Sequence, residues 1–211
     1  MDKQSFKSKS ALLVIDMQNG LFKGNVNPHN AQLILSNINR LIEHQRLNEM
    51  PIIFIRHVGE RGTPLDPECM NTQLIDDLQF DPIKDLVIEK KYPSCFKNTF
   101  LKELLDKLFV DEVLITGMKT EYCIDTTVRI ASEYGYKVVL ASDAHTTFDS
   151  AILNAGEMIS YHNQILNNVF AKVQTSEEYI TLIWTKIKLG SPANTVVIGG
   201  AFYFDLSNWA L

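Results

Sequence analysis

The chain has 211 residues, 45% of them apolar, which is enough for one globular domain with a substantial core. Its net charge of −5 is mild and is not gathered into blocks, so neither a basic stripe for nucleic acid nor a Lys/Arg cluster for an anionic membrane is present. No uninterrupted apolar run approaches the roughly 18 residues that a membrane span needs.

Strand-like and helix-like segments alternate through the first half of the chain. The polar N-terminus does not resemble a secretory signal. Apolar runs predict strands at 11–16, 51–56 and 86–90, and the first of them ends in Asp16. Apolar residues at helical spacing predict a helix around 33–42, and a long loop rich in Gly, Pro and charged residues covers 58–72.

The second half continues the alternation. The predicted helices are 100–108, a helix after Cys123, 152–166, and a last helix opened by the capping box at 175–178; the predicted strands are 113–116, 137–142 and 169–173. We predict one domain over 1–187 and a C-terminal extension over 188–211. The extension contains an apolar run from Thr195 to Phe204, which an appended strand, an oligomer contact or a cloning remnant would explain.

Continuous apolar strands separated by amphipathic helices favour an α/β fold. We predict a three-layer sandwich in which a parallel sheet is covered by helices on both faces. In such sheets ligands bind beyond the carboxyl ends of the strands.

Cys123 lies just after the strand at 113–116, in the first turn or so of the next helix. The positive end of a helix favours a thiolate, so a cysteine there can have its pKa lowered enough to act as a nucleophile. The alternative is a small buried cysteine that packs a helix onto the sheet. Cys69, Cys95 and Cys123 are an odd number without CxxC or zinc-type spacing, which predicts a reduced, cytoplasmic setting.

Three chemically different side chains share the carboxyl ends of the predicted strands. Asp16 ends the first, Lys90 and Lys91 end the third, and Cys123 follows the fourth. An acid, a cation and a thiol would converge on one rim if these strands are neighbours, which predicts a catalytic site.

Four segments in order carry a resemblance to a known family. Leu13–Phe22 resembles the opening motif of the isochorismatase-like cysteine hydrolases, which include nicotinamidase-like and N-carbamoylsarcosine amidohydrolase-like enzymes. Asp85–Leu101 resembles their lysine segment, Gly117–Thr127 their nucleophile segment, and Ser142–Asp149 extends the match.

The resemblance implies a six-stranded parallel sheet and an Asp–Lys–Cys triad, here Asp16, Lys90 and Cys123. It implies a cis peptide bond between Met118 and Lys119, and an oxyanion hole formed by the backbone N–H groups of Lys119 and Cys123. The other residues predicted to line a substrate pocket are Gln18, Phe22, His57, Tyr92, Tyr122 and Phe148. His57, His145 and Phe148 could line the pocket, but a structural or supporting role is favoured for each.

Two departures from the family limit what the resemblance implies. Metal-binding members carry an Asp-x-His arrangement after the second strand, where this chain has Arg56-His57-Val58, so we predict no metal and no cofactor. Isochorismatases proper lack the nucleophilic cysteine, so Cys123 indicates acyl chemistry on an amide, ureido compound or lactam. An isochorismatase-type ether hydrolase and a redox-active thiol protein without hydrolase activity are the alternatives. The predicted partner is a small molecule, not nucleic acid or a membrane, and the chain is expected to form a homo-oligomer, either a dimer or a tetramer.

Periodicity cannot decide between Lys90 and Lys91, because both faces of the sheet should be buried. In the family pattern the lysine stands four residues before a serine, which here selects Lys90 before Ser94.

Overall fold

The computed structural model describes residues 9–24, 26–181, 195–198 and 202–205. The strands are β1 Ser10–Ile15, β2 Ile52–His57, β3 Leu86–Lys90, β4 Glu112–Met118, β5 Lys137–Thr146, β6 Lys172–Gln174, β7 Thr195–Ile198 and β8 Phe202–Asp205. The helices are α1 Asn19–Phe22, α2 Ala31–Leu47, the 3-10 helix η1 Met70–Thr72, α3 Leu101–Lys107, the π-helix η2 Thr120–Ile124, α4 Asp125–Glu133 and α5 Ala155–Leu166.

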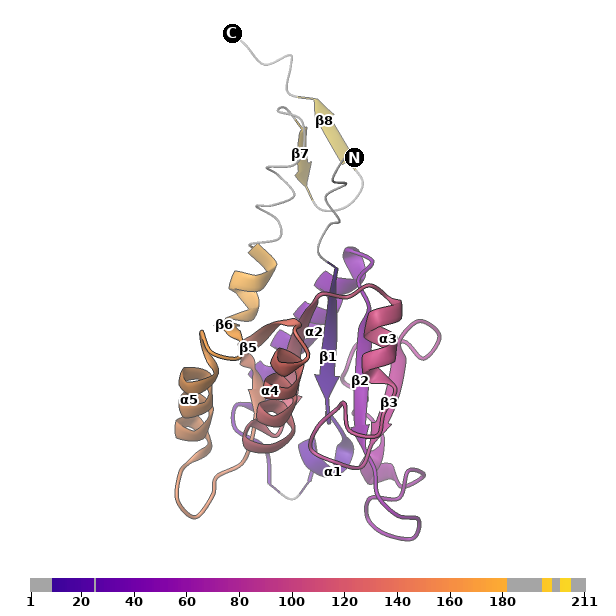
Figure 1. Cartoon of the computed structure of the whole chain (residues 1–211), viewed down its shortest axis with the longest axis vertical. Helices are drawn as coiled ribbons and strands as arrows, with labels where there is room; N and C mark the ends of the chain where they lie inside the picture. Colours follow the sequence, from indigo (N-terminus) through magenta and orange to yellow (C-terminus); the bar gives the residue numbers. More distant parts are fainter. Residues whose placement is uncertain (1–8, 25, 182–194, 199–201, 206–211) are drawn as a thin grey trace. The chain divides into compact units, whose positions relative to one another are not determined.

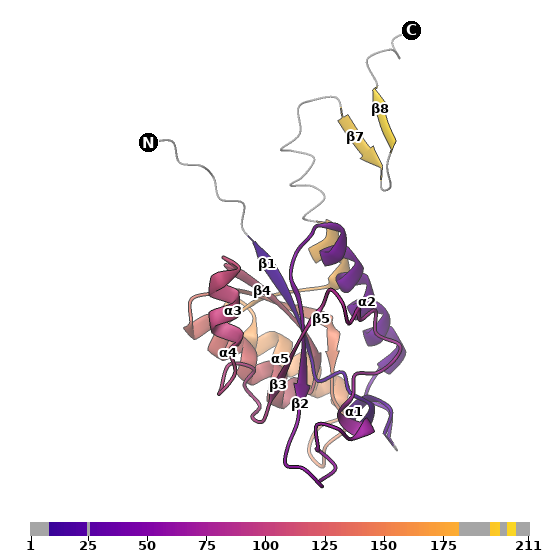
Figure 2. The same cartoon turned by 90° about the vertical axis from the view of Figure 1, so that its right-hand side faces the viewer.

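Strands β1 to β6 form one parallel sheet in the order β3-β2-β1-β4-β5-β6. Helix α2 lies on one face, and α3 and α4 lie on the other (Figures 1 and 2). The predicted α/β sandwich with six parallel strands is therefore confirmed. The order places the ends of β3, β2, β1 and β4 side by side, and β1 and β4 sit where the chain direction across the sheet reverses, the position at which such sheets bind ligands.

Alternate residues of the central strand β1 pack into two cores, one on each face of the sheet. Leu13 and Ile15 of β1 belong to the cluster that packs under α3 and α4, and their neighbours Leu12 and Val14 are equally buried on the α2 side. A strand buried on both faces reads as a continuous apolar run, which is why β1 could be found from sequence.

Three predicted boundaries differ from the structure. Helix α5 begins at Ala155, not at 152, because the Asn154 side chain accepts from the N–H of Glu157 and the Glu157 carboxylate accepts from the N–H of Asn154. The strand predicted at 169–173 is β6, at Lys172–Gln174, after a turn. Strand β5 extends to Thr146 through an irregularity in its pairing with β4.

A second compact unit comprises residues 177–211, and in it β7 and β8 pair as an antiparallel hairpin. The apolar run in the predicted C-terminal extension thus contains strands, whereas the domain boundary predicted at 187 lies outside the described residues. A helix begins at 176, as the capping box predicted. In the described part of the chain, no helix combines the length and the apolar character that crossing a membrane requires.

Candidate active site

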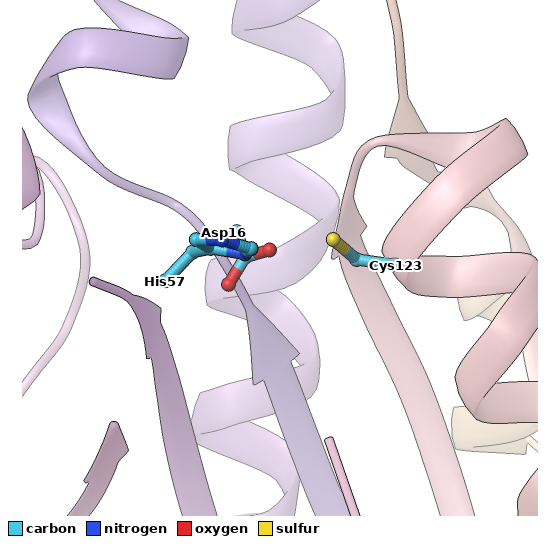
Figure 3. Close-up of side chains that lie close together, drawn as sticks. All are labelled: Asp16, His57 and Cys123. Atoms are coloured by element: carbon cyan, nitrogen blue, oxygen red, sulfur yellow. The ribbon is translucent and has the colours of Figure 1, made fainter. Parts of the chain in front are cut away.

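Asp16 and Cys123 meet at the carboxyl edge of the sheet, where the chain leaves β1 and β4. Asp16 follows β1 with φ at 54°, a left-handed conformation that aspartate tolerates better than most residues. Cys123 lies in η2, and Figure 3 shows its sulfur facing the side chains of Asp16 and His57. His57 ends β2 and pairs in register with Lys90 at the end of β3.

The ammonium of Lys90 joins these groups. Its Nζ lies 2.7 Å from Oδ2 of Asp16, 3.2 Å from Sγ of Cys123 and 3.0 Å from Nδ1 of His57. Lys90 and Asp16 are each only 1% exposed. Burial is the largest single influence and would lower the pKa of Lys90, but Asp16, Cys95 and Cys123 together outweigh it and the pKa is raised.

His57 is neutral in this arrangement. An ammonium can only donate, so Nδ1 of His57 accepts and the proton of the ring lies on Nε2. Burial, followed by the charge of Lys90, lowers the pKa of His57. Its backbone is held by Gln18, whose side-chain amide accepts from the N–H of His57 and donates to its carbonyl.

The structure places Lys90, not Lys91, at this site. Lys90 is buried beside Asp16, whereas Lys91 is exposed. The register inferred from the spacing before Ser94 is the one observed.

The predicted lowering of the Cys123 pKa is wrong for the resting protein. Burial, reinforced by the Asp16 carboxylate, raises the pKa of Cys123 to about 12, and the opposing effect of Lys90 is smaller. The Lys90 ammonium is already paired with Asp16, so little of its charge remains to favour a thiolate.

Alkylation of Cys123 should therefore stay slow near neutrality. Only the thiolate reacts, so a pKa raised above that of a free cysteine means that the rate with iodoacetamide keeps rising between about pH 7 and pH 10. Peptide mass mapping across this range measures it for each cysteine separately. A rate at Cys123 that levels off below about pH 8 would contradict the raised pKa.

Close approach of two backbones fixes the turn before Cys123. Gly117 has φ at 113°, and a Cβ there would overlap the backbone of Ile15, its partner in β1. The peptide bond between Met118 and Lys119 is cis, at the position that the resemblance implied. The backbone N–H of Lys119 donates no hydrogen bond to another described residue.

A buried histidine is hydrogen-bonded to the segment that follows this turn. His145 is fully buried, with Nδ1 2.9 Å from Oγ1 of Thr120 and Nε2 2.9 Å from Oδ1 of Asn163. Burial lowers the pKa of His145 to about 4, so the ring is neutral, accepting from Thr120 and donating to Asn163. It holds the segment that carries Cys123 and does not line the cavity beside it.

A cavity of about 370 Å³ opens beside Cys123, at the lower end of the range for small-molecule sites. Of the predicted pocket residues, Gln18, His57 and Tyr122 line it, together with Lys119. Residues that we did not predict also line it: Gly20, Leu21, Pro64, Leu65, Asn71 and Pro93. The available signal was the long loop at 58–72, since loops of that length are often functional.

Three predicted pocket residues lie outside this lining. Phe22 is buried and faces a different cavity from α1, and Tyr92 is partly exposed beneath the ammonium of Lys97. Phe148 lies 5.1 Å from the ammonium of Lys119, with its ring against that side chain. None of the three lines this cavity, and substrate contact by them stays a prediction.

The residues at the site do not fit a metal ion. One ligand atom each from Asp16, His57 and Cys123 lie within 4.8 Å of one another, which is close enough for a shared ion. However, the Lys90 ammonium lies within 3.2 Å of a ligand atom of all three. A divalent cation would have to displace that charge or be repelled by it.

Comparison with known proteins shows a match to the isochorismatase domain over residues 10–178. An isochorismatase family protein of Bacillus subtilis is 31% identical over 179 residues, covering 81% of this chain and 98% of its own. Nicotinamidase 3 of Arabidopsis thaliana is 33% identical over 159 residues, covering 69% of this chain and 77% of its own. A crystal structure of an isochorismatase from Pseudomonas putida superposes with a TM-score of 0.73 at 30% identity, covering 80% of this chain and 89% of that one.

Proposed function

Because this chain belongs to the isochorismatase family of hydrolases, we propose that it is a cysteine-dependent hydrolase of a carbon–nitrogen bond other than a peptide bond. The substrate is a small amide, ureido compound or lactam, and the reaction passes through a thioester on Cys123. The observation that carries the proposal is the Lys90 ammonium that contacts Asp16 and Cys123 at once. The likeness to a nicotinamidase supports amide chemistry.

Asp16 is the proposed base and acid. Its Oδ2 accepts from Lys90, while its buried Oδ1 has no hydrogen-bond partner among the described residues. A buried carboxylate oxygen without a partner is costly, and substrate binding that excludes water leaves it as the acceptor for the thiol proton. The raised pKa of Cys123 means that this transfer accompanies attack instead of preceding it.

The proposed reaction has two halves. Asp16 takes the thiol proton as the sulfur attacks the carbonyl carbon, and the negative oxygen accepts from the N–H groups of Lys119 and Cys123. Asp16 then gives the proton to the leaving nitrogen, the C–N bond breaks, and the acyl group remains on Cys123 as a thioester. Water attacks the thioester as Asp16 removes its proton; the acid product leaves, and the proton returns to the thiol.

The alternative of a redox-active thiol protein is disfavoured by the two buried cysteines, Cys95 and Cys123. Cys95 is buried, its thiol accepts from Thr127, and burial raises its pKa to about 12. Neither Cys95 nor Cys123 is therefore held as the thiolate that oxidation requires.

A panel of small amides, ureido acids and lactams tests the proposal through release of ammonia or acid. Wild-type protein should turn over at least one class, and Cys123→Ala should turn over none. Equal activity of the variant would exclude a thioester on Cys123, whereas cleavage of a vinyl ether by a protein that turns over none of the panel would favour the isochorismatase-type ether hydrolase.

Turnover should also survive dialysis against a strong chelator. The centre of the three candidate ligands is taken by the Lys90 ammonium, so no metal takes part in the proposed steps. Activity lost on chelation and restored by zinc or iron would overturn the metal-free mechanism. Measuring the protein-bound metal content before and after dialysis separates removal of an ion from slow inactivation.

A further inference from the structure

The wall of the cavity beside Cys123 is largely apolar. Leu21, Pro64, Leu65, Pro93 and Tyr122 all line it. Leu65 is 44% exposed and Tyr122 54% exposed, so large apolar surfaces stand uncovered at its mouth. Covering such surface with an apolar group is favourable by about 25 cal/mol per Å².

Hydrogen bonds within the loop fix this wall in place. Arg56 donates from Nε to the carbonyl of Thr72 at 2.9 Å and from Nη2 to that of Pro67 at 2.6 Å. The N–H of Gly59 donates to the carbonyl of Leu65 at 2.6 Å. Leu65 is therefore presented by a braced loop, and binding does not have to order it.

The charges around the cavity cancel in pairs. Asp16 neutralises Lys90 at 2.7 Å. The Lys119 ammonium is 3.8 Å from the Glu121 carboxylate and lies over the rings of Tyr122 and Phe148. Arg56 is engaged by backbone carbonyls and lies 3.7 Å from Glu89.

Asn71 adds an uncharged polar group to the lining. Asn71 lines the cavity, and its side-chain amide makes no hydrogen bond to another described residue. Its uncharged amide can donate a hydrogen bond to a neutral polar group of a ligand or accept one from it.

We propose that the substrate is an uncharged amide whose non-reacting part is compact and apolar, with Leu65 as a specificity-determining residue. This inference rests on the proposed hydrolase function and narrows its substrate class. A carboxylated substrate, such as a ureido acid, would lose its hydration here without finding an unpaired cation. A neutral aromatic or branched aliphatic amide would instead cover Leu65 and Tyr122 and reach Asn71 with a polar edge.

A matched pair of alkylating reagents tests the charge preference without requiring turnover. Iodoacetamide and iodoacetate are nearly equal in size but differ by one negative charge. For each thiol, the rate with iodoacetamide is divided by the rate with iodoacetate. At pH 9 we expect this ratio to be about tenfold higher for Cys123 than for glutathione. Relative to glutathione, Cys123 should also react faster with N-phenyl iodoacetamide than with iodoacetamide.

Leu65→Arg supplies the missing cation. It should raise the relative rate of iodoacetate at Cys123 about tenfold, whereas Leu47→Arg, on the exposed end of α2, should not change it. Peptide mapping confines the measurement to Cys123.

The outcomes separate this inference from the hydrolase proposal. A normalised ratio that favours iodoacetate, or no reaction of Cys123 with any of the reagents, overturns the inference. An unchanged ratio in Leu65→Arg overturns the role of Leu65. The expected labelling in a protein that hydrolyses nothing in the panel would overturn the hydrolase proposal and leave only the preference of the cavity for a neutral, apolar ligand.

Discussion

Asp16→Asn is expected to lower turnover by about 10²- to 10⁴-fold while making Cys123 more acidic. The amide that replaces the carboxylate cannot take the thiol proton or return it to the leaving nitrogen. The same change removes a negative charge that raises the pKa of Cys123 and releases the Lys90 ammonium to pair with the thiolate. Alkylation by iodoacetamide should therefore become faster, by about tenfold for each unit by which the pKa falls.

Opposite changes in the two rates distinguish this mechanism from simple disruption of the site. Asp77→Asn is the matched control, because Asp77 is a surface residue paired with Lys23. It should leave both turnover and alkylation unchanged. A variant at position 16 that lost turnover and alkylation together would show that Asp16 organises the site without acting as a base.

Lys90→Ala is expected to change both quantities in the same direction. The pKa of Cys123 should rise further, because the only described ammonium bonded to its sulfur is gone, and turnover should fall by about 10²- to 10³-fold. Asp16 would be left as an unpaired buried charge, so the free energy of unfolding should drop by about 3–5 kcal/mol. Denaturant unfolding and steady-state kinetics measure the two effects.

Two comparison variants separate catalysis from stability at Lys90. Lys91→Ala removes an exposed charge next in sequence and should leave turnover and stability nearly unchanged. The double variant Asp16→Asn with Lys90→Met leaves neither charge buried alone, so it should recover stability but not turnover. A double variant with turnover near that of the wild type would show that the pair serves only folding.

The ends of the strands were predictable from the sequence for a physical reason. Strand β1 is buried on both faces and is a continuous apolar run, so the first charged residue after it, Asp16, marks the rim of the sheet. Convergence of Asp16, Lys90 and Cys123 then depends on strand order, which the structure shows and composition could not give; the motif resemblance implied the triad without it. Lys90 over Lys91 likewise depended on motif spacing, because strand periodicity allows either.

The walls of the cavity could not be predicted in the same way. Pro64, Leu65 and Asn71 lie on a loop that is held in part by hydrogen bonds from Arg56 to the carbonyls of Pro67 and Thr72, and such contacts leave no periodic pattern in the sequence. Aromatic residues close to the motifs in sequence did not identify the cavity lining, because Tyr92 and Phe148 pack against lysines and do not line the cavity. The pKa of Cys123 was mispredicted because desolvation depends on packing, which local sequence does not report.

The thioester on Cys123 is the claim on which the rest of the mechanism depends. Acid quenching during turnover of an amide identified by the substrate panel, followed by intact-protein and peptide mass spectrometry, tests it directly. We expect the mass of the acyl group on the peptide that contains Cys123, and its disappearance when hydroxylamine is added. Full turnover with no acyl adduct under conditions that preserve an authentic thioester, or an adduct on any other residue, would contradict the mechanism.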